Sequence, residues 1–174
     1  MSDSIQKALL FAAEAHGKQM RKYTGEPYIV HPVEVMSIVK SVTDDEEVLA
    51  AALLHDVIED TSVVAADISQ HFGSRVASLV DELTDRSKPE DGNRKARKKI
   101  DRDHLAEASA EAQTVKLADL IHNAISITEH DRRFAPVFVA EMAALLTVLD
   151  KGNKELFSRA STLVVAYEKD VKKL

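Results

Sequence analysis

The chain has 174 residues, of which 45% are hydrophobic, so it can bury one substantial core but is short for two independent domains. Its formal net charge of −6 argues against a nucleic-acid-binding protein, and the lack of cysteine excludes a disulfide framework and thiolate chemistry. Because the chain is poor in Gly, Pro and aromatic residues, we expect an all-α fold, a single compact multi-helix domain over residues 1–174.

Hydrophobic periodicity predicts several helices in the first half of the chain, over residues 5–15, 32–42, 44–55, 65–71 and 74–83. Pro32 suits the first turn of the second of these, where its missing amide proton is not needed. Thr43 and Glu46 have the spacing of a capping box, which predicts the start of the third. The polar segment between the first two, with Gly25 and Pro27, is expected to be a loop.

The second half begins with a charged stretch, residues 84–93, whose Pro89 and Gly92 predict a turn or mobile loop. The basic run RKARKK follows from Arg94. Further helices are expected over residues 111–129, 135–149 and 153–174, with Gly152 as the stop between the last two.

The amino terminus does not resemble a signal peptide, because the acidic residue Asp3 precedes a short amphipathic run. No stretch approaches the apolar length of about 20 residues that spans a bilayer. We therefore expect a cytoplasmic protein that binds neither membranes nor nucleic acid. The sequence does not fix the oligomeric state, and it is compatible with a homo-oligomer.

The segment AAALLHDVIEDT, residues 50–61, is the most informative for chemistry. On one helix, its polar residues would fall within an arc of about 140°, and they are His55, Asp56, Glu59 and Asp60. The preceding turns are apolar nearly all round, so the helix is expected to be buried. Buried carboxylates are costly unless a cation or hydrogen bonds compensate them, which favours a divalent metal. The alternative is a solvated polar stripe on an amphipathic helix.

Two other segments carry residues of the same kind. His31 precedes Pro32, which biases its backbone towards an extended conformation from which it can project into a cleft, although a histidine standing alone is more often a packed core residue. Asp119 and Asn123 lie four residues apart within an apolar run, hence on one helix face. Two imidazoles and two carboxylates suit Mn²⁺, Fe²⁺ or Zn²⁺ better than Mg²⁺ or Ca²⁺.

The order of His31, His55-Asp56 and Asp119 resembles that of the HD phosphohydrolase superfamily, a helical fold with one or two bound metals. From about residue 4 onwards the chain looks like the hydrolase domain of RelA/SpoT proteins, especially its small single-domain relatives. Four strings carry this resemblance: RKYTGEPYIVHP, ALLHDVIEDT, HFGSRVASLVDELT and VKLADLIHN. It implies a hydrolase that removes the 3′-pyrophosphate from the guanine nucleotide (p)ppGpp, giving GDP or GTP and pyrophosphate.

The resemblance also implies a role for each matching residue. Its Mn²⁺ ligands match His31, His55, Asp56 and Asp119. Its acidic pair, which positions or deprotonates the attacking water, matches Glu59 and Asp60. The residues implied in substrate binding are Arg21 and Lys22 on the guanine base, Asn123 on the nucleotide, and Arg94, Lys95, Arg97 and Lys98 in the phosphate-binding region.

The chain departs from this family pattern in two ways. Relatives usually have a Tyr lining the nucleotide pocket on the next-to-last helix, whereas PVFVAEMAALL contains none. The sequence also has no room for the synthetase or regulatory domains of long family members, so we expect it to degrade the nucleotide without making it.

Two other functions stay open at this point. The first is an HD phosphohydrolase of another nucleotide, such as an NADPH 2′-phosphatase, and the second is a non-catalytic module that senses a nucleotide. The complete ligand set argues against the second, because a silent member would be expected to lose some ligands. The remaining histidines are expected at the surface or in packing, and they are His16, His71, His104, His122 and His130.

Overall fold

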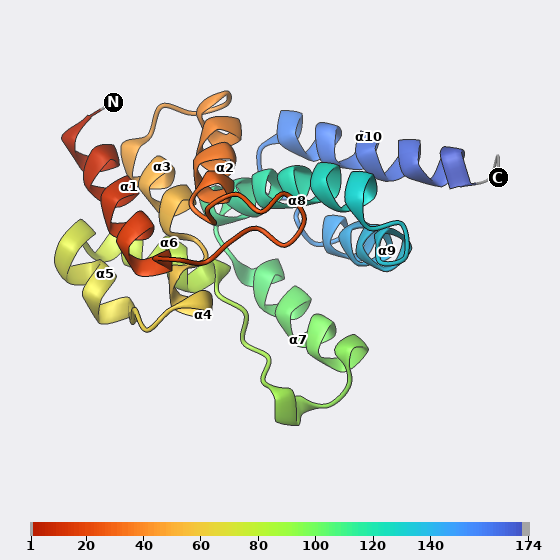
Figure 1. Cartoon of the computed structure of the whole chain (residues 1–174), viewed down its shortest axis with the longest axis horizontal. Coiled ribbons are helices and arrows are strands. Elements are labelled where there is room, and N and C mark those ends of the chain that lie inside the picture. Colours follow the sequence, from red (N-terminus) through yellow and green to blue (C-terminus); the bar gives the residue numbers. More distant parts are fainter. Residues whose placement is uncertain (1, 172–174) are drawn as a thin grey trace. The chain divides into compact units, whose positions relative to one another are not determined.

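The computed structural model describes residues 2–171 and has an all-α fold, as predicted, with no β-strand among these residues (Figure 1). An isolated antiparallel bridge pairs Met20 with Pro27 in the loop after the first helix. The chain divides into two compact units, Met1–Thr84 and Asp85–Leu174. The single domain expected from the sequence stays a prediction.

The first unit is built around α3 (Glu46–Leu54), which packs against α1, α2 and α6. The bounds of the surrounding helices are α1 Asp3–His16, α2 Val30–Lys40, α4 Val57–Asp60, α5 Ala65–Phe72 and α6 Ser74–Leu83. Each residue from 48 to 54 is buried, so α3 is apolar all round, as expected for a core helix.

The capping box predicted at Thr43 and Glu46 for the start of α3 is wrong. Asp45 is the N-cap instead, and its carboxylate accepts hydrogen bonds from two backbone amides of the first turn. The Thr43 hydroxyl accepts from the amide of Asp45 and so supports the cap from outside the helix. Arg75 on α6 also donates to Asp45, with Nη2 2.7 Å from Oδ2, and thereby links the two helices.

The predicted continuation of this helix through His55 is also wrong. α3 ends at Leu54, His55 and Asp56 form a turn, and α4 is a separate helix of four residues. In an unbroken helix the Ala52 carbonyl would accept from the amide of Asp56. That carbonyl lies 2.8 Å from Nδ1 of His55, so a side chain competes with the backbone for it.

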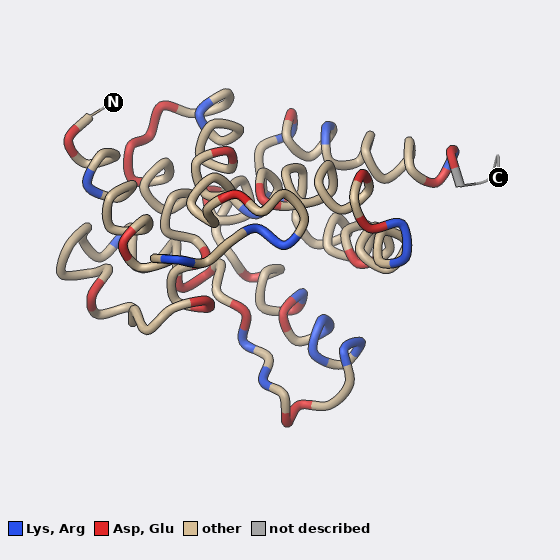
Figure 2. Tube along the Cα trace, in the orientation of Figure 1, with Lys and Arg blue, Asp and Glu red and all other residues tan. Residues whose placement is uncertain are grey.

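The second unit is built around α8 (Ala110–His130), which packs against α9 (Ala135–Leu146) and α10 (Lys154–Val171). The 3-10 turn η1 (Pro89–Asp91) and the helix α7 (Arg94–Glu107) precede it. Periodicity did not predict α7, because most of its residues are charged and only Asp101 and Leu105 are buried. Lys and Arg residues gather along its first turns (Figure 2).

The segment before α7, expected as a turn or mobile loop, is tied to that helix by Asp101. This carboxylate is only 3% exposed. Its Oδ1 accepts from the backbone amides of Arg86 at 3.0 Å and Ser87 at 2.9 Å, and its Oδ2 accepts from the Ser87 hydroxyl at 2.9 Å. A buried carboxylate with three donors is a strong local anchor.

Gln113 on α8 hydrogen-bonds to the last turns of α7 and to the turn between α9 and α10. Its fully buried side chain donates from Nε2 to the carbonyls of Leu105 at 2.9 Å and Val148 at 3.1 Å. Its Oε1 accepts from the amides of Lys151 at 2.9 Å and Gly152 at 3.2 Å. Both donor and both acceptor positions of the amide are thereby used on backbone groups.

Gly152 lies in the turn between α9 and α10, as predicted, and it touches α8 closely. A Cβ at this position would lie 2.7 Å from Cδ1 of Leu117 and 3.2 Å from the backbone carbon of Gln113. The turn can therefore approach α8 only because residue 152 has no side chain. None of the helices within residues 2–171 combines the length and the apolar character needed to span a membrane.

Candidate active site

His31, His55 and Asp56 come together in the first unit, where their ligand atoms all lie within 4.8 Å of one another. Nε2 of His31 is 3.5 Å and Nε2 of His55 is 3.2 Å from the same carboxylate oxygen, Oδ2 of Asp56. The two imidazoles are buried, with 1% and 3% exposure, whereas Asp56 is half-buried. The three side chains offer two nitrogens and one oxygen, a donor set suited to a divalent transition metal.

The orientation of His55 fits such a metal. A backbone carbonyl can only accept, so the contact between Nδ1 of His55 and the Ala52 carbonyl places the proton on Nδ1. Nε2 then carries the lone pair that a metal needs, and it is this atom that faces Asp56. A metal-binding histidine commonly has its other nitrogen fixed in this way.

His31 lies in the first turn of α2, which begins at Val30, so the extended backbone predicted for this residue is wrong. Its amide donates to the carbonyl of Tyr28 at 2.9 Å. Pro32 is tolerated directly after it because no partner is required for an amide in the first helical turn. The His31 ring meets the His55 ring edge-to-face at 5.2 Å between centroids, which directs both rings to one place.

Asp56 accepts a hydrogen bond from the hydroxyl of Tyr28, with 2.6 Å between the phenol oxygen and Oδ2. Tyr28 belongs to the loop before α2 and stands three residues before His31. The carboxylate oxygen that faces both imidazoles therefore also has a phenol donor.

Glu59 and Asp60, the predicted acidic pair, lie on the short helix α4 and are exposed. They do not share one continuous helical face with His55 and Asp56, because the helix breaks between the two pairs. The surrounding chain removes part of the hydration of Asp60 and so raises the pKa of its carboxyl, and the nearby charge of Asp56 acts in the same direction. The nearby Tyr28 hydroxyl acts in the opposite direction and lowers the pKa of Asp60.

Arg21 and Lys22 lie in the loop between α1 and α2. The guanidinium carbon of Arg21 is 5.9 Å from the centre of the Tyr28 ring, so Arg21 lies over the same tyrosine that contacts Asp56. The ammonium of Lys22 is 3.1 Å from the hydroxyl of Tyr23 and lies over that ring. Arg21 therefore contacts a residue that hydrogen-bonds to Asp56.

Asp119 and Asn123 lie on α8 in the second unit. Asp119 is 5% exposed, and its Oδ1 accepts from the Asn123 amide at 2.6 Å, so the two residues share a helix face as predicted from their spacing. Lys116, one turn earlier, donates to Oδ2 of Asp119 at 2.9 Å. Whether Asp119 joins the three residues of the first unit stays a prediction.

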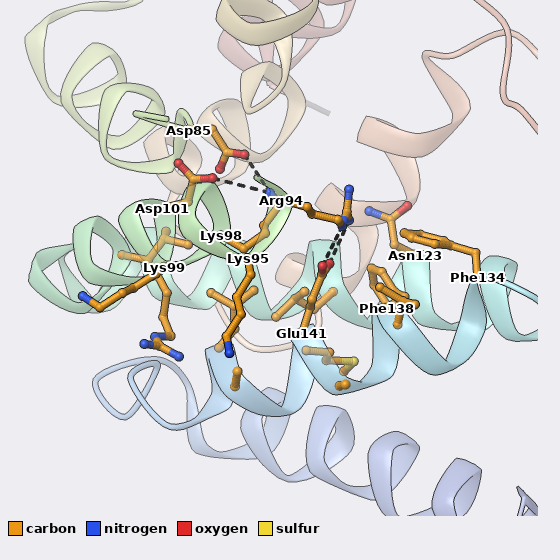
Figure 3. Close-up of a pocket in the computed structure, with 18 of the residues that line it drawn as sticks. Asp85, Arg94, Lys95, Lys98, Lys99, Asp101, Asn123, Phe134, Phe138 and Glu141 are labelled. Carbon is orange, nitrogen blue, oxygen red and sulfur yellow. Dashed lines mark hydrogen bonds and ion pairs between the residues drawn. The ribbon is translucent and has the colours of Figure 1, made fainter. Parts of the chain in front are cut away.

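A cavity of about 1270 Å³ lies in the second unit, bounded by α7, α8 and α9 (Figure 3). Its volume exceeds the several hundred Å³ typical of small-molecule sites. Asp119, Asn123 and Lys116 line it together with Phe134 and Phe138, and Asn123 lies beside the two rings (Figure 3). Charged and aromatic groups thus face one space that is large enough for a nucleotide.

Three of the four predicted phosphate-binding residues of the basic run line this cavity. Arg94, Lys95 and Lys98 line it, whereas Arg97 is not among its lining residues. Arg94 forms a two-pronged ion pair with Glu141, at 2.6 and 2.8 Å, and its guanidinium carbon lies 5.1 Å from the centre of the Phe134 ring.

Lys98 is paired within the cavity as well. Its ammonium lies 2.9 Å from Asp85 and 3.6 Å from Asp101 (Figure 3). Two of the predicted phosphate-binding cations, Arg94 and Lys98, therefore have carboxylate partners.

Sequence reasoning did not single out several residues of these sites. Tyr28 stands in the same string as His31, so its proximity to the site was a readable signal. The spacing of three between Lys116 and Asp119 also predicts contact on a helix. Glu141 gave no local signal, because its partner Arg94 is 47 residues away along the chain. Phe138 lines the cavity on the helix where relatives usually have a Tyr.

The chain is similar to a known protein family, to curated proteins and to solved structures. A family model described as an HD domain matches residues 8–149. The protein of Xenopus tropicalis named guanosine-3′,5′-bis(diphosphate) 3′-pyrophosphohydrolase MESH1 is 41% identical over 123 residues, which are 68% of this chain and 66% of that protein. A solved structure, described as a metazoan ortholog of SpoT that hydrolyzes ppGpp, matches with a TM-score of 0.86 at 28% identity, over 96% of this chain and 97% of that one.

Some relatives are much longer proteins. The guanosine-3′,5′-bis(diphosphate) 3′-pyrophosphohydrolase of Aquifex aeolicus is 48% identical over 83 residues, which are 48% of this chain and 12% of that protein. Several of the curated relatives are much longer than this chain, which matches between 11% and 18% of their length.

Proposed function

Because the chain belongs to the HD-domain family, we propose that it is a metal-dependent phosphohydrolase that removes the 3′-pyrophosphate from (p)ppGpp. The products are GDP or GTP and pyrophosphate. The observation that carries the proposal is that the Nε2 atoms of His31 and His55 both face one carboxylate oxygen of Asp56 in the first unit. The Xenopus tropicalis relative, named for this reaction, supports the choice of substrate.

The proposed metal is Mn²⁺. His31, His55 and Asp56 would hold it, with Asp119 of the second unit as the fourth ligand implied by the resemblance. When bound, a divalent metal would supply Lewis acidity and lower the pKa of water to near 7. The mixed donor set suits Mn²⁺, Fe²⁺ or Zn²⁺, so the choice of Mn²⁺ rests on the resemblance.

Glu59 and Asp60 are proposed to orient the attacking water and to take its proton. Their exposure on α4 leaves both carboxylates accessible to water and substrate. Partial desolvation of the Asp60 carboxyl, which raises its pKa, favours its role as a proton acceptor.

We propose that the nucleotide contacts the residues that the resemblance assigns to substrate binding. Arg21 and Lys22 would pack on the guanine base, and Asn123 would contact the nucleotide. Lys95 and Lys98 line the cavity of the second unit, where they can meet phosphate oxygens. Arg94 binds Glu141 through Nε and Nη2, which leaves the two donors of Nη1 for a phosphate oxygen.

The test is product analysis by ion-exchange chromatography after incubating the purified chain with ppGpp and Mn²⁺. The proposal predicts equal amounts of GDP and pyrophosphate, and no turnover by the Asp56→Ala variant. Release of orthophosphate from NADPH without cleavage of ppGpp would overturn the proposed substrate. Tight ppGpp binding without any turnover in Mn²⁺ would overturn the proposed enzyme activity.

A further inference from the structure

Tyr28 is the residue outside the three candidate ligands that is most directly engaged with them. Its hydroxyl donates to Oδ2 of Asp56 at 2.6 Å, the oxygen that both imidazole nitrogens face. The carboxylate of an aspartate rotates readily about its terminal torsion. A phenol donor that selects one oxygen and holds it toward His31 and His55 removes this freedom.

Tyr28 is itself held from behind by His16, at the end of α1. The His16 ring is 3% exposed, and its centre lies 4.6 Å from that of Tyr28 at an interplanar angle of 38°. The amide of Tyr28 donates to the backbone carbonyl of Gln19 at 2.9 Å. The ring of Tyr28 is therefore held by the last residue of α1, and its backbone is held by the segment that follows α1.

The side chain of Gln19 extends this arrangement to α4. Its Nε2 donates to the backbone carbonyl of Asp60 at 2.8 Å, which requires the other end of the amide to be the oxygen. That Oε1 lies 2.7 Å from Nδ1 of His16 and must accept from it. One continuous set of contacts thus connects α1 with the helix that carries the acidic pair.

We propose that Tyr28 is a positioning residue that holds Asp56 in its metal-binding orientation, and that His16 and Gln19 hold Tyr28 in turn. The inference rests on the proposed function, since it requires that Asp56 binds a metal. Hydrogen-bond partners of metal ligands typically change metal affinity by about 10–100-fold when they are removed.

The test compares Mn²⁺ binding to the metal-free full chain by isothermal titration calorimetry in the wild type, Tyr28→Phe and Tyr23→Phe. The Tyr28→Phe variant keeps the ring on His16 and loses only the hydroxyl. Its Kd for Mn²⁺ should rise about 10–100-fold. Tyr23→Phe is the matched control, because Tyr23 lies in the same loop and its hydroxyl contacts Lys22. Its Kd should stay that of the wild type.

Two further readouts separate positioning from other roles. The melting temperature of the metal-free Tyr28→Phe variant should equal that of the wild type, and a lower value with unchanged Kd would assign Tyr28 a purely structural role. Hydrolysis should fall at limiting Mn²⁺ and return to the wild-type kcat at saturating Mn²⁺. A kcat that stays low at saturation would mean that Tyr28 acts on Asp60 or on the substrate and not through the metal, which overturns the proposal.

The outcomes also separate this inference from the function on which it rests. If the wild type binds Mn²⁺ and Tyr28→Phe binds it equally well, the inference is wrong and the proposed function stands. If the wild type binds no divalent metal, the proposed function fails, and the role of Tyr28 fails with it.

Discussion

His55 stands at the break between α3 and α4, where a backbone contact fixes the orientation of its ring. Its Nδ1 contacts the Ala52 carbonyl at 2.8 Å, which leaves Nε2 as the atom that faces Asp56. The orientation of this imidazole is therefore set by α3, a helix that is buried along its last seven residues.

Replacing Glu59 with Gln should separate proton handling from metal binding. The amide keeps the size of the side chain but cannot take a proton from water, so kcat should fall by about 100-fold or more. Steady-state kinetics at saturating Mn²⁺ measures this effect. Calorimetry should show an unchanged Kd for Mn²⁺, since Glu59 is exposed on α4 and is not a proposed ligand.

The Asp56→Ala variant supplies the contrast, because it should lose Mn²⁺ binding and activity together. Loss of Mn²⁺ binding in Glu59→Gln, or a wild-type kcat, would contradict the role assigned to Glu59.

The residue types at this site could be predicted from the sequence, but their arrangement could be predicted only in part. A helical period of 3.6 residues puts His55 over Glu59 only if the helix is unbroken. The competition of a side chain for the Ala52 carbonyl is a local event that periodicity does not encode. The contact of Tyr28 with Asp56, 28 residues apart, likewise depends on the folded chain.

At the scale of helices and turns, Asp101 is expected to make the stability of the second unit depend on pH. Burial raises the pKa of this carboxyl, but donors from Ser87 and Arg86 and the charge of Lys98 outweigh it, so the pKa is lowered in the folded chain. The stabilisation is therefore complete above the unfolded-state value of about 3.9 and is lost as the pH falls through the folded-state value.

Asp101→Asn should destabilise the fold at pH 7 by about 1–3 kcal/mol, because the charge-assisted hydrogen bonds are lost. Urea unfolding across the acid range measures the difference from the wild type, which should shrink as the pH falls below about 4. Asp103→Asn is the control on the same helix, since Asp103 is exposed and its carboxylate pairs with two neighbouring cations of α7, Lys99 and Arg102. A difference for Asp101→Asn that is independent of pH would contradict the ionic anchor.

Gly152→Ala should also destabilise the second unit. The added methyl would lie 2.7 Å from Cδ1 of buried Leu117, and relief requires α8 and the turn to move apart. Overpacking of this kind costs about 1–3 kcal/mol. Thermal unfolding measures the loss, and the penalty should be smaller in a Leu117→Val background, where space is freed. An unchanged melting temperature would show that the close approach is not needed.

The helices were predictable where one face is apolar. The range predicted for α6 matches Ser74–Leu83, and α8 extends only one residue beyond its predicted range at either end. α7 was missed because its stability comes from tertiary contacts and from the Asn93 cap rather than from an apolar stripe. Proline and glycine marked the turns, but not how closely Gly152 approaches α8.

At the scale of the whole molecule, metal removal should lower thermal stability. A ligand present at about 100 times its Kd stabilises the folded state by about 2.7 kcal/mol. For a chain of this size, this corresponds to a fall of about 5–10 °C in Tm when EDTA removes the metal. Differential scanning calorimetry with and without Mn²⁺ tests this. The Asp56→Ala variant should show the same Tm in both conditions, and a wild type that also does so would contradict metal binding.

The all-α class followed from composition, since few residues favour strands or break helices. The division into two compact units could not be predicted from composition, because no Gly-rich or Pro-rich linker marks the boundary at residues 84 and 85. The boundary lies instead at the end of a helix, in a charged stretch that the sequence marked only as a turn.

The buried amide of Gln113 has a consequence for the order of folding. Its four backbone partners come from the last turns of α7 and from the turn after α9, so its hydrogen bonds are completed only when both segments have formed. The closing of the loop of about 40 residues between them carries an entropic cost that comes before these contacts form. The Lys151 and Gly152 amides should therefore acquire protection from hydrogen exchange late in refolding, after the amides inside α8.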